Sequence, residues 1–139
     1  MDLGLKDKVA IVGGASKGLG RASAQVLAEE GAKVTICSRT SADLEQAAKE
    51  IRESTGAEVM TYAADLDKLE SITGLIDATV AQFGGLDILV NNSGGPPLAR
   101  SMDATEEQWE TAVQRSLIFF GRMCRESIPH LGSRGGGRI

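Results

Sequence analysis

The sequence feature that most constrains the fold is a glycine-rich segment between an apolar run and a run with helical spacing. Residues 13–20 read Gly-Gly-Ala-Ser-Lys-Gly-Leu-Gly and follow the apolar run Lys8–Val12. Because glycine lets the backbone approach a ligand and a helix N-terminus attracts anions, such a loop between a strand and a helix is typical of a pyrophosphate site. The spacing G-x-x-x-G-x-G differs from the commoner G-x-G-x-x-G, and a tight structural turn is the alternative interpretation.

Composition excludes several classes of protein. The chain has 139 residues, of which 42% are hydrophobic and 24% charged, as expected of a single globular domain. Its net charge of -4 argues against nucleic acid as a partner, and no apolar run approaches the roughly 20 residues that cross a membrane. Cys37 and Cys124 are far apart in the sequence and belong to no metal-binding motif. We therefore expect both to be reduced packing residues in a cytoplasmic protein without a metal site. His130 is the only histidine, which leaves no histidine-based triad.

Predicted strands and helices alternate along the chain. We expect strands at Lys8–Gly13, Lys33–Ser38, Glu58–Ala63 and Leu86–Val90. We expect helices at Gly18–Glu30, from Thr40 or Ser41 to Glu53, at Asp67–Phe83 and at Thr105–Ser127, with a loop at Asn91–Asp103. Three helix starts have a capping residue followed three positions later by a partner: Thr40 with Asp43, Asp67 with Glu70, and Thr105 with Gln108.

This alternation predicts an α/β fold in which a parallel sheet has helices on both faces and right-handed crossovers. In such a doubly wound sheet the ligand crevice lies where the strand order reverses, here at the carboxyl ends of the first and fourth strands. The glycine-rich segment and the Asn91–Gly95 segment follow these two strands. We therefore expect a nucleotide site between them.

From Leu5 to Ile139 the chain resembles the short-chain dehydrogenase/reductase family, including reductases of 3-oxoacyl-carrier-protein type. The resemblance depends on four features: Gly14-x-x-x-Gly18-x-Gly20, Asp65-Leu66 after the third strand, Asn91-Asn92-Ser93-Gly94 after the fourth, and Trp109 on the next helix. It implies a Rossmann-like sheet of four strands with the start of a fifth, and one NADP-binding domain over residues 1–139. It also implies a homo-oligomer and a small-molecule carbonyl or alcohol substrate.

The residue that ends the second strand distinguishes the two nicotinamide cofactors. A carboxylate there would bind a free ribose 2′-hydroxyl and repel a 2′-phosphate. Here the residues are Ser38 and Arg39, with no acid in that turn, and Lys17 in the glycine loop offers a second positive charge. We therefore expect NADP(H) rather than NAD(H). The alternative interpretation is that Arg39 is an ordinary solvated surface residue.

The resemblance also assigns individual residues. It implies that Asp65 accepts a hydrogen bond from the adenine amino group, that Leu66 packs beside the ring, and that Asn92 and Gly94 line a ribose. Asn91 and Ser93 are expected mainly to tie the loop to its neighbours, and a helix-capping acid is the alternative interpretation of Asp65. The predicted cofactor-binding set is Gly14, Ser16, Lys17, Gly18, Leu19, Gly20, Ser38, Arg39, Asp65, Leu66, Asn92, Ser93 and Gly94.

No catalytic residue is predicted. Members of the family use a tyrosine as general acid and base with a lysine four residues later, but the only tyrosine here is Tyr62, followed at that distance by Leu66. We interpret Tyr62 as a packing residue. The family's relay asparagine is replaced by Ser116, for which a water-holding role and plain helix packing both stay open.

Residues 134–139 resemble the loop that enters the family's fifth strand. The chain is therefore expected to be truncated before the catalytic serine, tyrosine and lysine, which leaves the edge of the fourth strand unpaired. One helix face should also lose its cover, namely Trp109, Val113, Leu117, Phe120 and Cys124. We expect association through these surfaces. Three functions remain open: the cofactor half of an NADP-dependent oxidoreductase, a non-catalytic nucleotide-binding module, and an inactive fragment.

Overall fold

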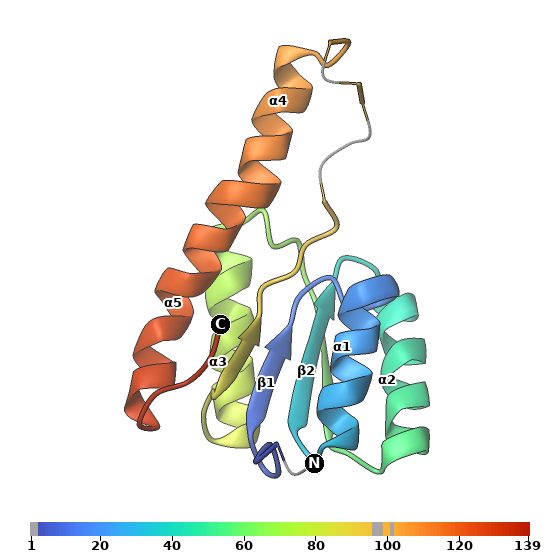
Figure 1. Ribbon diagram of the computed structural model, residues 1–139, viewed down its shortest axis with the longest axis vertical. Coiled ribbons are helices and arrows are strands. Elements are labelled where there is room, and N and C mark those ends of the chain that lie inside the picture. Colours follow the sequence, from blue (N-terminus) through green and yellow to red (C-terminus); the bar gives the residue numbers. More distant parts are fainter. Residues whose placement is uncertain (1–2, 96–98, 101) are drawn as a thin grey trace.

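The computed structural model describes residues 3–95, 99–100 and 102–139 and contains one four-stranded parallel sheet between helices (Figure 1). The strands are β1 Val9–Val12, β2 Lys33–Ser38, β3 Val59–Ala63 and β4 Ile88–Val90. The helices are α1 Gly18–Glu29, α2 Ser41–Thr55, α3 Leu69–Phe83, α4 Glu106–Val113, the π-helical segment η1 Gln114–Ile118, and α5 Phe119–Ser133.

The strand order is β3-β2-β1-β4, and every pair is parallel. The chain therefore moves outward from β1 through β2 to β3 and then returns to the other side of β1 with β4. This reversal is the topology that the alternating pattern predicts, and the Rossmann-like α/β fold is confirmed. It places the loops after β1 and β4 next to each other at one end of the sheet.

Each face of the sheet has its own apolar core. Helices α1 and α2 cover one face, while α3 and α5 cover the other (Figure 1). Adjacent residues of β1 serve both, since Val12 belongs to the first core and Ile11 to the second. Both side chains are fully buried, which explains why this strand is apolar at every position.

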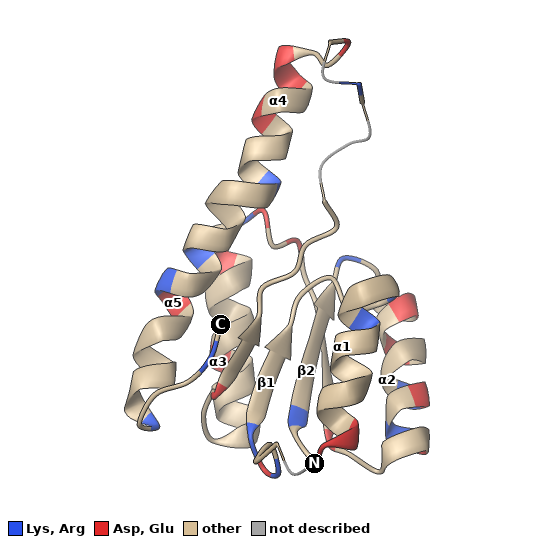
Figure 2. Cartoon of the chain, viewed as in Figure 1, with Lys and Arg blue, Asp and Glu red and all other residues tan. Residues whose placement is uncertain are grey.

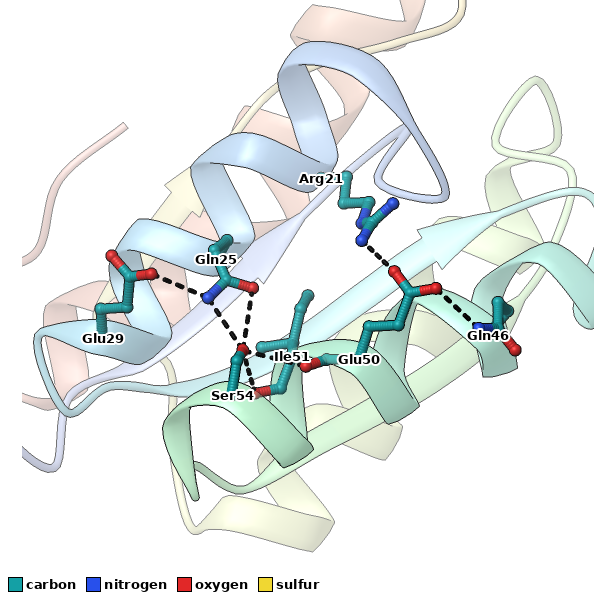
Figure 3. Close-up of polar contacts among 7 residues, drawn as sticks. All are labelled: Arg21, Gln25, Glu29, Gln46, Glu50, Ile51 and Ser54. Carbon is teal, nitrogen blue, oxygen red and sulfur yellow. Dashed lines mark hydrogen bonds and ion pairs between the residues drawn. The ribbon is translucent and has the colours of Figure 1, made fainter.

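Polar contacts above the first core join α1 to α2 (Figure 3). Arg21 forms an ion pair with Glu50, and the Gln25 side-chain amide donates to the Ser54 hydroxyl at 3.0 Å. Arg21 lies in the first turn of α1, and its charge is balanced by the Glu50 carboxylate on the neighbouring helix α2. These contacts fix the helix that follows the glycine loop.

The structure corrects one of the predicted helix starts and one of the predicted capping pairs. Thr105 and Gln108 form the expected reciprocal capping box of α4. Thr40 is the N-cap of α2, but its side chain makes no capping hydrogen bond. Asp67 does not begin α3, which starts at Leu69 with Lys68 as its N-cap. The physical reason is that residues of the last helix hold Asp67, as described below.

The last helix is also longer than expected and is not uniform. It continues past Ser127 to Ser133, and residues 114–118 are π-helical. Burial explains the extension, because Ser127 and Leu131 are both buried and Leu131 belongs to the second core. The preceding loop predicted at Asn91–Asp103 includes residues 96–98 and 101, which lie outside the described residues.

The edge of β4 is not fully unpaired, contrary to expectation. Arg138 forms a parallel bridge with Ile88, its N–H donates to the Asp87 carbonyl at 3.0 Å, and its carbonyl accepts from Leu89 N–H at 2.9 Å. Arg134 reinforces this arrangement by donating from Nε to the Asp87 carboxylate at 3.0 Å. The C-terminal residues thus begin a fifth strand, as the resemblance implies.

Candidate functional site

A cavity of about 620 Å³ opens at the carboxyl ends of the strands, where the glycine loop and the loop after β4 meet. Its described lining comes from five segments: Gly14, Ser16, Lys17, Leu19 and Gly20; Ser38, Arg39, Thr40 and Asp43; Ala64–Asp67; Asn92–Gly95; and Arg115 with Phe119. This location is the one predicted from the order of strands.

The side chain of Asn92 lies beneath the glycine loop. Its amide nitrogen donates to the carbonyl oxygens of Gly13 at 3.0 Å and Gly14 at 3.4 Å. A Cβ on Gly14 would lie 2.8 Å from that nitrogen, and one on Gly20 would lie 2.9 Å from it. These two glycines are therefore needed to admit Asn92. Its amide holds the loop, and the residue also lines the cavity.

The N-terminus of α1 faces the same cavity without a side-chain cap. Lys17 is its N-cap residue and makes no side-chain capping hydrogen bond, and the first turn of α1 contains no acid. By contrast, α2, α3 and α4 each have an acidic residue in the first turn, as Figure 2 shows at the start of α4. The positive end of the α1 dipole is thus left uncompensated by its own residues, which favours an anion there.

Gly18 serves the loop in a different way from Gly14 and Gly20. Its φ is +60°, a left-handed conformation that costs other residues about 1–2 kcal/mol, while a Cβ there would meet nothing within 4 Å. Gly18 is also the one predicted site residue that does not line the described cavity. It shapes the turn into α1 rather than forming the cavity wall.

Polar and basic groups gather at the end of β2. Ser38 Oγ is buried and makes no hydrogen bond to any described residue. Arg39 and Lys17 are exposed, and within the described ranges neither forms an ion pair. The cavity also contains Asp43, from the first turn of α2, which corrects the expectation that no acid lies near this turn.

The end of the cavity after β3 adjoins Ser38, whose carbonyl accepts from Ala64 N–H at 2.9 Å, and it contains apolar side chains, Asp65 and an ion pair. Ala64, Leu66 and Phe119 line it, and Phe119 is only 3% exposed. Asp67 accepts from Arg115 Nε at 3.2 Å. The carboxylate of Asp65 accepts from the Asp67 N–H at 3.2 Å and so stabilises the turn after β3 rather than the start of α3.

The loop after β4 is tied to the last helix. The Asn91 amide donates to the Phe120 carbonyl at 3.1 Å and contacts Cys124 Sγ at 3.5 Å. Ser93 Oγ donates to the Arg115 carbonyl at 3.1 Å, within the π-helical segment. Both contacts agree with the loop-tying roles expected of Asn91 and Ser93.

Sequence reasoning missed seven lining residues: Thr40, Asp43, Ala64, Asp67, Gly95, Arg115 and Phe119. Several of them adjoin predicted residues, so extending each motif by one or two positions would have found Thr40, Ala64, Asp67 and Gly95. Arg115 and Phe119 gave no such signal. Their approach to the cavity depends on how the last helix packs.

Neither Tyr62 nor Ser116 lines the described cavity. The hydroxyl of Tyr62 lies against Gly74 of α3, where a Cβ would overlap with it. The Tyr62 side chain packs against the second core, so its interpretation as a packing residue is confirmed. Ser116 is exposed in the π-helical segment and is absent from the cavity lining.

Two other features bear on the kind of site. In the described part of the chain no group of three or more His, Cys, Asp or Glu side chains could hold a metal ion. Over the same residues, no helix is long and apolar enough to cross a bilayer. Cys37 and Cys124 are free thiols, and burial raises the pKa of the Cys37 thiol to about 12.

Comparison with known proteins gives consistent matches over nearly the whole chain. A family model described as short chain dehydrogenase matches residues 8–139. The 3-oxoacyl-[acyl-carrier-protein] reductase of Vibrio cholerae is 36% identical over 137 residues, which are 99% of this chain and 54% of that protein. The chain spans about half the length of the curated relatives it matches.

Solved structures agree with the family match. L-Sorbose reductase from Gluconobacter frateurii, in complex with NADPH and L-sorbose, has a TM-score of 0.92 at 34% identity, over 99% of this chain and 52% of its own. NAD+-bound xylitol dehydrogenase has a TM-score of 0.90 at 28% identity, over 97% of this chain and 52% of its own. The similar structures therefore include complexes with either nicotinamide cofactor.

Proposed function

Because the chain belongs to the short-chain dehydrogenase family, we propose that it binds NADP(H) as the cofactor-binding part of an oxidoreductase. The observation that carries this proposal is the bare N-terminus of α1 beside a glycine loop held by Asn92. Backbone N–H groups and a helix dipole are there directed at one cavity, which suits a pyrophosphate. The predicted residues other than Gly18 line that cavity.

The donor groups at the end of β2 fit a phosphate on the adenosine ribose. Ser38 Oγ is a buried hydroxyl with no described partner, and such groups normally have one. Arg39 adds a planar set of donors, and Lys17 adds a second charge from the glycine loop. Asp43 also lines the described cavity here, but it lies in the first turn of α2 rather than at the end of β2. We therefore propose NADP(H) over NAD(H).

The proposed reaction is hydride transfer with a small-molecule carbonyl or alcohol. When bound, the nicotinamide supplies or accepts the hydride. The residues of this chain bind and orient the cofactor, but they offer no tyrosine as proton donor, since Tyr62 is packed against α3. We propose that the 139 residues alone bind the cofactor without reducing a carbonyl compound.

A non-catalytic nucleotide-binding module is the second candidate function. The observation that favours it is that Tyr62 lies against α3 and not in the cavity, while Ser116 is exposed. An inactive fragment that binds nothing is the third. Nucleotide binding separates the first two candidates from the third, and carbonyl reduction by the protein that contains this chain separates the first from the second.

The direct test is a titration of the purified chain with NADPH and NADH, followed by nucleotide fluorescence. We expect NADPH to bind more tightly. Arg39→Asp should weaken NADPH binding about tenfold or more while changing NADH binding little, because only NADPH has the 2′-phosphate. Equal losses for both nucleotides would contradict the NADP assignment. An absence of binding by the unmodified chain would contradict the proposed function itself.

A further inference from the structure

We propose that Arg115 is a base-binding residue of this cavity, with its guanidinium held by Asp67 as a planar surface for the nucleotide base. The inference rests on the proposed function, because it names the part of the bound nucleotide that this residue contacts. Arg115 belongs to none of the motifs that predict the site. It comes instead from the π-helical segment between α4 and α5.

The two ends of the cavity suit different parts of a nucleotide. The end formed by the glycine loop and Ser38-Arg39 offers N–H groups, a hydroxyl and unpaired positive charges, as phosphates require. The end formed by Ala64–Asp67 and Phe119 adjoins Ser38, whose carbonyl accepts from Ala64 N–H at 2.9 Å, and it combines apolar side chains with the carboxylates of Asp65 and Asp67. A planar, weakly polar base is stabilised by apolar and aromatic surfaces, so it belongs at the second end. Arg115 lines that end together with Asp67.

The charge of Arg115 is already compensated. Its Nε lies 3.2 Å from Asp67 Oδ2, with 30% of the Arg115 side chain and 34% of the Asp67 side chain exposed. Lys17 and Arg39 have no such carboxylate partner within the described residues. A phosphate is therefore attracted to Lys17 and Arg39 rather than to Arg115. A neutralised guanidinium still has a flat face that can stack on a ring.

The surroundings of this ion pair fix its orientation. The Asp67 carbonyl accepts from Arg122 Nη1 at 3.1 Å and from Gln114 Nε2 at 3.4 Å, so three side chains of the last helix bind one residue. The Arg115 carbonyl is held in turn by Ser93. The backbone carbonyl of Arg115 and the Nε of its side chain are thus both held. Its two Nη groups make no hydrogen bond to any described residue and are free to contact a ligand.

Three variants of Arg115 test this role, with adenosine 2′,5′-bisphosphate and inorganic pyrophosphate as probes in isothermal titration calorimetry. Arg115→Leu removes the guanidinium, Arg115→Lys keeps the charge and the pairing with Asp67 but loses the flat group, and Arg115→Gln keeps a small flat amide. We expect Arg115→Leu and Arg115→Lys to weaken binding of the adenosine probe about tenfold. Arg115→Gln should lose less, and pyrophosphate binding should not change in any of the three.

The pattern across variants decides the outcome. Unchanged adenosine binding in Arg115→Leu and Arg115→Lys would overturn the assignment, as would full retention in Arg115→Lys alone, because charge and not planarity would then matter. Equal loss of pyrophosphate binding would make Arg115 a phosphate ligand and also overturn it. If the unmodified chain binds neither probe, the proposed function fails as well. Thermal melts of each variant show whether the fold is intact, and Arg115→Lys is the variant expected to keep it.

Discussion

The side-chain amide of Asn92 lies 3.0 Å from the carbonyl oxygen of Gly13 and connects the loop after β4 to the loop after β1. These two residues are 79 positions apart in the chain. One amide group thereby sets the position of the glycine loop relative to the rest of the cavity.

Asn92→Ala should free the glycine loop and lower both stability and nucleotide affinity. Loss of the hydrogen bonds to Gly13 and Gly14 should reduce the free energy of unfolding by about 1–2 kcal/mol. Calorimetric melting measures the first effect and NADPH titration the second. Gln46→Ala is a suitable control, because Gln46 makes only an exposed contact with Glu50 on α2. Unchanged NADPH affinity in Asn92→Ala would show that the loop holds its shape without this amide.

Gly18→Ala and Gly56→Ala form a matched pair. Both glycines have positive φ, +60° and +72°, and a Cβ at either position would meet nothing within 4 Å. Each substitution should therefore cost a similar backbone strain of about 1–2 kcal/mol, measured by urea unfolding. Only Gly18 is the first residue of α1, between the cavity-lining residues Lys17 and Leu19, so only Gly18→Ala should also weaken NADPH binding. Similar affinities in the two variants would count against an anion site at the start of α1.

Asp87→Ala should destabilise the chain strongly. This buried carboxylate accepts from Val9 N–H at 2.9 Å and from Arg134 Nε at 3.0 Å, so its removal leaves a buried N–H without a partner and deprives the Arg134 guanidinium of its ion pair. We expect a loss of about 2–3 kcal/mol in chemical denaturation. Lys8→Ala is the control, because Lys8 is half exposed and lies 3.9 Å from the same carboxylate. A loss in Lys8→Ala as large as in Asp87→Ala would contradict this explanation.

Cys37 should make the stability of the fold depend on alkaline pH. Burial raises its pKa from 9.0 to about 12, so above pH 9 the unfolded chain releases a proton that the folded chain retains. Stability must therefore fall as pH rises from 9 toward 12, by up to about 1.4 kcal/mol per pH unit from this group. Other groups titrate in that range, so the measurement is the difference between the unmodified chain and Cys37→Ala in urea unfolding at pH 8 to 10. Parallel pH profiles would refute the prediction.

The apolar face of the last helix should cause self-association. Trp109, Leu117 and Phe120 are 50%, 66% and 47% exposed, and α4 projects beyond the ends of the strands (Figure 1). Neighbouring apolar side chains exposed along one helix favour contact with another apolar surface. Sedimentation velocity of the chain should show concentration-dependent association, and replacing Leu117 and Phe120 by Ser should reduce it. A monomer at all concentrations would show that these side chains are tolerated in water.

Much of the architecture could be predicted because its signals are local. The glycine-rich segment, the apolar strands and the turn residues each depend on a few neighbouring positions, and together they predicted the sheet, its strand order and the location of the cavity. These local signals were least accurate at the boundaries of helices. Asp67 has the side chain of a helix cap, yet Arg115, Gln114 and Arg122 hold it outside α3.

The sequence by itself determined the order of strands and helices and the motifs that mark the cavity, because both follow from short-range spacing and from backbone conformations that only certain residues adopt. Tertiary structure alone decided what those motifs contact. The pairing of Arg115 with Asp67 joins residues 48 positions apart, and that of Asn92 with Gly13 joins residues 79 apart. Such contacts depend on the angle at which the last helix packs and on the distance between neighbouring strands. Those quantities arise from burial of side chains across the whole chain, so no local stretch of sequence specifies them.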